Sequence, residues 1–296
     1  MATTASSSSP VSTQQERAGR RRRSRRSGDR PGLRWVIAFV LAILFAFPLY
    51  WMVATALMPR ADLLAGDYGL IPTTFEWSNF TRAWEAYPFG RWFVNSTVIA
   101  VASVALTVAV NLCAGYAFAK IRFPFRTLLF LLIISTLMIP VQVIMVPQYQ
   151  IVSDLGWTDT YWAVIIPRAA EAFGIFFARQ YFLGIPNELI EAARIDGASE
   201  WKIFRRIVLP LSKPLIAVLV IFTFMWRWNE FVWPLLVLKD SNEYTATIGL
   251  YFLRGQHGDD VTALMAMGLL SIIPIVLVFL FFQRYFVEGL VRSGIK

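Results

Sequence analysis

The sequence contains very few of the residues from which enzymes build nucleophilic or metal sites. Its 296 residues include one cysteine, Cys113, and one histidine, His257. No intrachain disulfide can form, and neither a zinc site nor a Cys/His catalytic pair is expected. The sequence also lacks a Gly-x-x-x-x-Gly-Lys-Ser/Thr string, the loop that cradles nucleotide phosphates. We therefore expect the chain to bind no metal and no cofactor of its own, and not to be an enzyme.

Charge is scarce as well, since charged residues make up 16% of the chain and hydrophobic residues 57%. Soluble domains carry about 25% charged residues. A helix that crosses a bilayer needs about 20 mainly apolar residues, and its backbone groups must be satisfied within the segment. The sequence thus predicts an all-α integral membrane protein with six transmembrane helices, at about Trp35–Leu57, Phe93–Ala119, Leu128–Val146 (with Pro140), Tyr161–Leu183, Leu215–Leu238 and Leu264–Phe286 (with Pro274).

Residues 1–34 form a tail rich first in Ser and Thr and then in Arg, with too little apolar area to fold, so we expect it to be disordered. Such a tail can bind nucleic acid, or its Arg25-Arg26 pair can mimic a twin-arginine signal. The apolar run that follows is too long for the core of a signal peptide. We favour a cytoplasmic anchor attracted to anionic membrane lipid, with no nucleic-acid partner, ahead of one membrane domain over residues 35–296.

The distribution of Lys and Arg predicts the orientation. With the N-terminus inside, most of the 28 Lys and Arg residues fall in the tail, between spans two and three, in a central loop and near the C-terminus. Segments rich in Lys and Arg stay in the cytoplasm. Both termini and the loop at residues 186–214 are therefore expected on the cytoplasmic side of the cell membrane. Two long polar segments, 59–92 and 239–261, are expected as exposed loops on the outer side.

The central loop is the longest polar interruption in the C-terminal half, and its chemistry predicts two short helices. Pro186 suits the first position of a helix, on which Leu189, Ala192 and Ala193 recur on one face. Gly197 suits a left-handed C-cap, and Ser199 can cap the next helix.

The second helix of the loop is predicted to be amphipathic and to end at Pro210 and Pro214. Its apolar face comprises Ile203, Phe204, Ile207 and Val208, and its polar face comprises Lys202, Arg205 and Arg206. The polar side would be available to a partner.

The central loop contains Glu191-Ala192-Ala193, Asp196-Gly197-Ala198, Phe204, Ile207, Leu209-Pro210 and Pro214. The spacing of these residues resembles the EAA loop of bacterial ABC-importer inner-membrane permeases. Further strings are similar to the carbohydrate-uptake branch, of the maltose type and the glycerol-phosphate type, namely Trp228-Asn229-Glu230-Phe231, Gly255-Gln256 and residues 283–290.

The resemblance implies a type I importer permease with six spans that pairs with a second homologous permease and docks on two cytoplasmic ATPase subunits, which hold ATP and Mg. An extracytoplasmic binding protein would deliver the substrate. The implied ATPase-coupling residues are Glu191, Ala192, Ala193, Asp196, Gly197, Ala198, Phe204, Leu209 and Pro210. In this family the C-terminal tail, here residues 288–296, contacts the ATPases, and the segment 239–261 reaches into the binding protein. A sugar, an oligosaccharide, a polyol or a glycerol phosphate would each fit as substrate.

Ionisable residues inside spans are candidates for the transport pathway. In the fifth span the candidates are Trp226, Arg227, Trp228, Asn229, Glu230 and Trp233, of which Arg227 and Glu230 can neutralise each other at i, i+3. The alternative is an interfacial aromatic belt with a structural ion pair. Arg168 and Glu171 are predicted to form a similar pair with a structural role, and Asn111 an interhelical hydrogen bond.

Three other classes of protein compete with the importer. An ion-coupled secondary transporter would show inverted repeats and carboxylates at the membrane centre. No clear repeat is present, and Glu171 and Glu230 each lie close in sequence to an arginine. A membrane enzyme would need a catalytic constellation, and a receptor would not need the pattern of the central loop.

Overall fold

The structure is a computed structural model that describes residues 31–66, 69–256 and 260–294. Every regular element in these ranges is a helix. The chain divides into two compact units, Met1–Trp51 and Met52–Lys296. Most of the predicted disordered tail, and also His257, lie outside the described residues.

Three helices are long and apolar enough to cross a membrane without a break. They are α2 (Pro31–Leu57), α5 (Phe89–Lys120) and α16 (Val261–Gly294), the last over its first 25 residues. They confirm the first, second and sixth predicted spans. α5 has 32 residues, which corresponds to a length of about 48 Å. Pro274 lies inside α16 without ending it, as predicted.

The predicted third and fourth spans are bent, so their prediction as continuous helices is wrong. α6 (Arg126–Ser135) continues through η1 (Thr136–Met138) and meets α7 (Val141–Asp154) at 104°. α8 (Tyr161–Ile165) continues through η2 (Ile166–Arg168) and meets α9 (Ala172–Leu183) at 44°. The first bend has a local cause, because a residue before proline avoids helical geometry, and Ile139 is extended ahead of Pro140, with ψ at 116°.

The predicted fifth span is divided in two. α13 (Lys213–Asn229) ends where Glu230 is extended, with ψ at 128°, and α14 (Val232–Val237) follows. The ring of a proline clashes with the carbonyl four residues before it in a continuous helix, and Pro234 stands four residues after Glu230. Upstream, Glu200–Leu211 meets α13 at 80° and belongs to the central loop. Counting each bent pair as one span gives up to six spans in the described part of the chain.

The two segments predicted to be exposed loops on the outer side contain several helices, which corrects their prediction as loops. Residues 59–92 contain α3 (Arg60–Leu64), α4 (Ser78–Ala86) and the first turn of α5, and residues 239–261 contain η4 (Ser241–Glu243) and α15 (Ala246–Gln256). Both segments are polar on average, but α4 and α15 each bury a narrow face. α4 buries Asn79 and Ala83, four residues apart. On α15, Gly249 lies so close to Trp92 that a Cβ there would be 2.0 Å from the ring.

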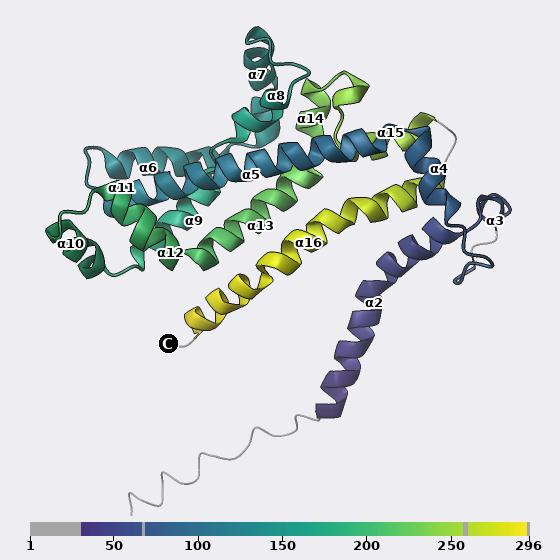
Figure 1. Ribbon diagram of the computed structural model, residues 1–296, viewed down its shortest axis with the longest axis horizontal. Helices are drawn as coiled ribbons and strands as arrows, with labels where there is room; N and C mark the ends of the chain where they lie inside the picture. Colours follow the sequence, from purple (N-terminus) through teal and green to yellow (C-terminus); the bar gives the residue numbers. More distant parts are fainter. Residues whose placement is uncertain (1–30, 67–68, 257–259, 295–296) are drawn as a thin grey trace, which may run out of the picture. The chain divides into compact units, whose positions relative to one another are not determined.

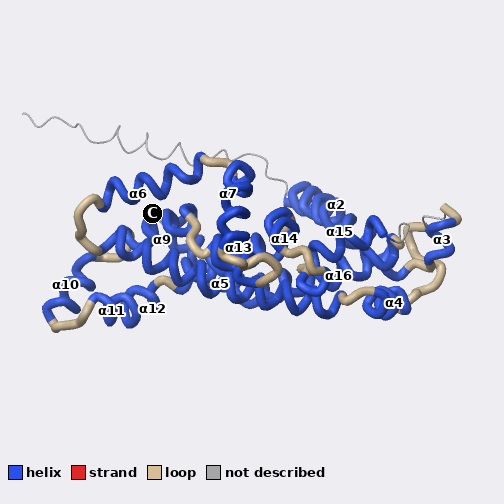
Figure 2. The backbone as a smooth tube through the Cα atoms, turned by 90° about the horizontal axis from the view of Figure 1, so that it is seen from above, coloured by secondary structure: helices blue, strands red, loops and turns tan. Residues whose placement is uncertain are grey.

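α5 is the helix around which residues 52–296 are organised. In Figure 1, α9 and α13 run alongside α5, while α10 (Asn187–Ile195), α11 (Glu200–Ile203) and α12 (Leu209–Leu211) gather at one end of it. The view from above in Figure 2 places α10, α11 and α12 far from α4. Small residues bring α5 and α9 together, since a Cβ on Gly115 would be 2.5 Å from the Cβ of Ala178.

Candidate functional site

The first helix of the central loop ends in a left-handed turn, as predicted. α10 covers Asn187–Ile195, so Pro186 is the residue before the helix rather than its first residue. Gly197 has φ +77°. The N–H of Ala198 bonds to the carbonyl of Ala193, and the N–H of Gly197 bonds to that of Arg194, at 3.0 Å each. These two hydrogen bonds make a Schellman C-cap, for which glycine is the preferred residue.

The second helix contains a π segment that was not predicted from the sequence. The Oγ of Ser199 accepts a hydrogen bond from the N–H of Lys202, which confirms the predicted cap. After α11 the chain forms η3, a π-helix over Phe204–Val208, and then α12. Pro210 explains the change, because its ring would clash with the Arg206 carbonyl in an α-helix. The hydroxyl of Ser212 donates to the Val208 carbonyl at 2.7 Å, which satisfies an acceptor next to the distortion.

The loop divides into a buried face and an exposed face. Ile203, Phe204 and Val208 are buried, with Ile207 half-buried, whereas Lys202, Arg205 and Arg206 are exposed, as predicted. On α10 the anchor is Ile190, which is 2% exposed. The predicted coupling residues on α10 and its C-cap are mostly on the surface, with Glu191, Ala192, Asp196 and Gly197 exposed and Ala193 and Ala198 half-buried. Next to them Ile195 is 86% exposed, an apolar surface residue that the sequence analysis did not single out.

Two residues of α5, neither of them predicted from the sequence, hold the loop in place. The Tyr116 hydroxyl donates to Glu200 Oε2 at 2.8 Å, and Arg194 Nε donates to Glu200 Oε1 at 2.6 Å. Lys120 Nζ donates to the Ile185 carbonyl and to Asn187 Oδ1, at 2.7 Å each. The hydrogen bond from Arg194, together with that from Tyr116, keeps the pKa of Glu200 below its usual value, against the opposing effect of partial burial.

Four charged residues meet where spans four and five are interrupted. Glu171 precedes α9, and Glu230 follows α13. Arg168 Nη2 lies 2.8 Å from Glu230 Oε1, and Arg227 Nη2 lies 2.5 Å from Glu171 Oε1. Arg227 Nη1 is also 3.3 Å from Glu230 Oε2, which confirms the predicted i, i+3 contact. The predicted pairing of Arg168 with Glu171 is wrong, because each of these residues instead contacts the charged partner on the other span.

This charged cluster, formed by Arg168, Glu171, Arg227 and Glu230, is anchored on α5. The Thr107 hydroxyl donates to the Arg168 carbonyl at 3.1 Å, and Arg227 Nη2 donates to the same carbonyl at 3.0 Å. The N–H of Glu171 donates to Asn111 Oδ1 at 3.2 Å, which confirms the predicted interhelical hydrogen bond of Asn111. The Arg227 side chain is 1% exposed, and the Arg168, Glu171 and Glu230 side chains are 18%, 25% and 15% exposed.

The aromatic pathway candidates do not lie together. Trp228 is 3% exposed and donates from Nε1 to the Ser271 carbonyl at 2.9 Å. Trp233 is 0% exposed and donates from Nε1 to the Ala163 carbonyl at 2.9 Å. Trp226 is 68% exposed, and Asn229 is also exposed, with its Nδ2 donating to the Met225 carbonyl at 2.8 Å. The fifth span therefore presents Trp226 and Asn229 on its surface and packs Trp228 and Trp233 into this chain.

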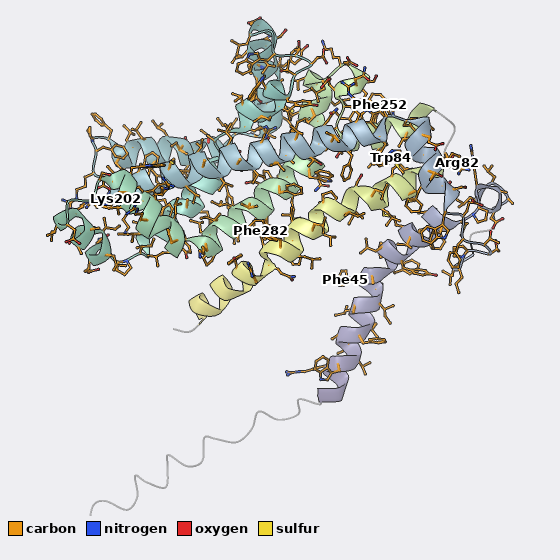
Figure 3. The ribbon with its side chains drawn as sticks, viewed as in Figure 1. Phe45, Arg82, Trp84, Lys202, Phe252 and Phe282 are labelled. Carbon is orange, nitrogen blue, oxygen red and sulfur yellow. The ribbon has the colours of Figure 1, made fainter. Side chains whose placement is uncertain are left out.

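A separate group of charges lies where α3 and α4 meet the start of α16. Asp260 lies 3.4 Å from Arg60 and 3.8 Å from Arg82. In Figure 3, Lys202 of the central loop and Arg82 lie at opposite ends of the part of the chain that surrounds α5. Among the described residues, no group of three or more His, Cys, Asp and Glu side chains is placed to hold a metal ion.

Comparison with known proteins gives consistent results. The family model for the binding-protein-dependent transport system inner membrane component matches residues 111–292. The arabinooligosaccharides transport system permease protein AraQ of Halalkalibacterium halodurans is 38% identical over 272 residues, which cover 90% of this chain and 98% of AraQ. The sn-glycerol-3-phosphate transport system permease protein UgpE of Pectobacterium atrosepticum is 39% identical over 267 residues, covering 87% of this chain and 94% of UgpE.

A solved structure shares the fold. It is a chain of a bacterial ABC transporter involved in the import of the acidic polysaccharide alginate, and it superimposes with a TM-score of 0.78 over 94% of this chain and all of that one, at 23% sequence identity. The predicted fold class, an all-α membrane protein with the type I permease fold, is confirmed.

Proposed function

Because the chain belongs to the family of binding-protein-dependent transport system inner membrane components, we propose that it takes up a carbohydrate or a related polyol or glycerol phosphate by ATP-driven alternating access. It is a multi-pass membrane protein and a transport permease. The relatives AraQ and UgpE, named for arabinooligosaccharides and for sn-glycerol-3-phosphate, support this range of substrates.

The geometry of the central loop is the observation that carries the proposal. A short helix with exposed Glu191 and Ala192, ended by a Schellman turn at Gly197, stands at one end of the long span α5. Ile190 of this helix packs against residues of α5 and α9. Glu200 of the next helix bonds to Arg194 of the short helix and to Tyr116 of α5. A partner that pulls on this loop therefore pulls on the spans themselves. We infer that an ATPase subunit receives α10 in a surface cleft.

The complete importer is proposed to contain this chain, a second homologous permease, two cytoplasmic ATPase subunits with ATP and Mg, and an extracytoplasmic binding protein. Closure of the ATPase dimer moves the loops and opens the permeases outward, and hydrolysis resets them. The central loop and both termini face the cytoplasm, in agreement with the bias of Lys and Arg. The outer helices α3, α4 and α15 face the binding protein.

The substrate pathway is proposed to pass the exposed Trp226 and Asn229, with Arg227 and Glu230 behind them. An aromatic face and an amide suit the C–H groups and the hydroxyls of a sugar. Trp228 and Trp233 are buried in two different clusters of the core. The ion-coupled carrier is not favoured, because Glu171 and Glu230 are both paired with arginines.

Co-purification from detergent tests the docking proposal. We expect the ATPase to co-purify with the wild-type chain, and its recovery to fall at least tenfold with Glu191→Lys or Gly197→Asp. Glu85→Lys is the matched control, because Glu85 is exposed on α4, at the other end of α5. Recovery of the ATPase with all three variants at the wild-type level would refute docking through α10.

A further inference from the structure

The ion pairs of the charged cluster form an open chain. Arg168 contacts Glu230, Glu230 contacts Arg227, and Arg227 contacts Glu171. The fourth possible ion pair, between Arg168 and Glu171, is not formed among the described residues. These two residues are three positions apart at the bend between η2 and α9, so only a local rotation separates them from a pair of their own.

Two neutral arrangements of the cluster are therefore possible. In the crossed arrangement, which the structure shows, Arg168 pairs with Glu230 and Arg227 with Glu171 across the two spans. In an in-line arrangement, Arg168 would pair with Glu171, and Arg227 would keep Glu230. A buried charge without a partner is strongly unfavourable. Exchange between the two arrangements lets the two spans move against each other without leaving any of the four charges unpaired.

The backbone and the hydrogen bonding of the cluster are suited to such an exchange. Residues 169–171 and 230–231 are not helical, so Glu171 and Glu230 lie at joints between helices, while Arg168 is the last residue of η2 and Arg227 lies in the last turn of α13. The buried Nε atoms of Arg168 and Arg227 have no hydrogen-bond partner in the described structure. Both guanidinium groups therefore hold a spare donor that a second arrangement can use.

The cluster is connected to the central loop by two helices. α9 begins next to Glu171 and ends at Leu183, just before the loop. α13 begins at Lys213, where the loop ends, and its own end lies next to Glu230. The helices have 12 and 17 residues, or lengths of about 18 and 26 Å. A movement of the loop that shifts α13 against α9 must therefore appear at the cluster.

We propose that Arg168, Glu171, Arg227 and Glu230 are positioning residues of the transport cycle, which exchange from crossed to in-line ion pairs when the central loop moves. This inference rests on the proposed function, since it assigns the cluster to the step that links the loop to the pathway. The cluster contacts α5 at Thr107, whose hydroxyl donates to the Arg168 carbonyl. Thr107 lies in the middle third of α5, so the cluster lies at the same level of the membrane domain. The exchange thus occurs near the centre of the spans, where unpaired charge is least tolerated.

Swapping the two charges within one span distinguishes this proposal from a fixed clamp, in which the crossed ion pairs persist throughout the transport cycle. Arg168→Glu with Glu171→Arg keeps the in-line attraction and makes both crossed contacts repulsive, and Arg227→Glu with Glu230→Arg does the same from the other span. All four substitutions together restore every attraction. Each variant is expressed with the partner subunits, and three quantities are measured, namely recovery of the assembled complex, ATP hydrolysis and ATP-driven uptake in proteoliposomes.

We expect both double variants to assemble at near wild-type levels, because the in-line arrangement is one of their native states. Uptake by the double variants should fall at least tenfold below wild type while ATP hydrolysis persists. Uptake by the fourfold variant should be at least threefold higher than uptake by either double variant. Failure of the double variants to assemble, with assembly of the fourfold variant, would identify a fixed crossed clamp and overturn the exchange.

Two further results would also overturn the proposal. Wild-type uptake by the double variants would show that the cluster takes no part in transport. If the double variants lose uptake and the fourfold variant does not recover it, the individual side chains are needed for transport and their pairing is not. A wild-type complex without ATP-driven uptake would instead refute the proposed function, whereas the assembly of the double variants would still decide between exchange and clamp.

Discussion

The hydroxyl of Tyr116 donates a hydrogen bond to the carboxylate of Glu200, 84 residues away in sequence, with 2.8 Å between the oxygen atoms. Tyr116 belongs to the unbroken span α5, whereas Glu200 begins the second helix of the central loop. The Tyr116 ring also packs on Phe204 of the loop, with 5.0 Å between ring centroids. The loop is therefore fastened to a spanning helix by both polar and apolar contacts.

We expect Tyr116→Phe to loosen the loop without unfolding the membrane domain. The substitution keeps the ring and its packing and removes only the hydroxyl. Hydrogen bonds to charged groups contribute about 1.5–3 kcal/mol, and the partial exposure of Glu200 favours the lower end of this range. Trypsin cleavage at the loop arginines should accelerate roughly tenfold, since about 1.4 kcal/mol corresponds to that factor. Tyr251→Phe, on α15 and far from the central loop (Figure 1), should leave the cleavage rate unchanged.

The anchoring of the loop should also depend on pH. The hydrogen bonds from Arg194 and Tyr116 lower the pKa of Glu200 in the folded chain. A depressed carboxyl pKa stabilises the fold above the unfolded pKa, about 4.3 for glutamate, and the stabilisation is lost as pH falls through the folded value. The difference in thermal stability between detergent-solubilised wild type and Glu200→Gln should therefore be full at pH 7 and shrink below about pH 4.3. A difference that stays constant down to pH 4 and below would contradict this assignment.

Substitutions at Gly197 should follow the conformational preference of the new residue. A Cβ at this position meets no atom within 4 Å, so the penalty comes from the backbone alone, with φ at +77°. Left-handed geometry costs most L-residues about 1–2 kcal/mol, and asparagine adopts it more easily than others. We expect ATPase recovery in the order Gly197, Gly197→Asn, Gly197→Ala and Gly197→Val. Equal recovery with Asn and Val would show that the turn is not needed for docking.

The local features of the central loop could be predicted from sequence because each depends on residues a few positions apart. The C-cap at Gly197, the cap at Ser199 and the two faces of the second helix all follow from such short-range chemistry. The π segment was missed because it depends on how the chain relieves one proline clash among several possible ways. The anchors Tyr116 and Lys120 were missed because their partners lie far away in sequence.

The same difference explains the result for the charged cluster. Sequence spacing of i, i+3 correctly predicted the contact of Arg227 with Glu230, which lie at the end of one helix. It failed for Arg168 and Glu171, because the helix is interrupted between them and the position of the fifth span decides their partners. Hydropathy predicted where the spans lie, but the bends depend on tertiary contacts and on prolines that a membrane helix can also tolerate.

Gly174 on α9 should be among the least tolerant positions of the chain. A Cβ there would lie 2.0 Å from Asn111 Nδ2 and 2.7 Å from its Cγ, but 3.4 Å from its Cβ. Gly174→Ala therefore forces Asn111 to move, which also breaks its hydrogen bond with the N–H of Glu171. Overpacking of this kind costs about 1–3 kcal/mol, and we expect a clear loss of thermal stability of the detergent-solubilised chain.

A second substitution tests this steric explanation. Asn111→Ala removes the overlapping atoms and leaves an ordinary contact, so it should relieve the steric part of the loss in Gly174→Ala. It does not restore the acceptor of the partly buried Glu171 N–H, whose loss costs about 1–3 kcal/mol. Gly115→Ala is the matched control, because its Cβ would instead lie 2.5 Å from the Cβ of Ala178. Asn111→Ala should not rescue Gly115→Ala, and equal rescue of both would mean that Asn111→Ala relaxes the α5–α9 contact as a whole.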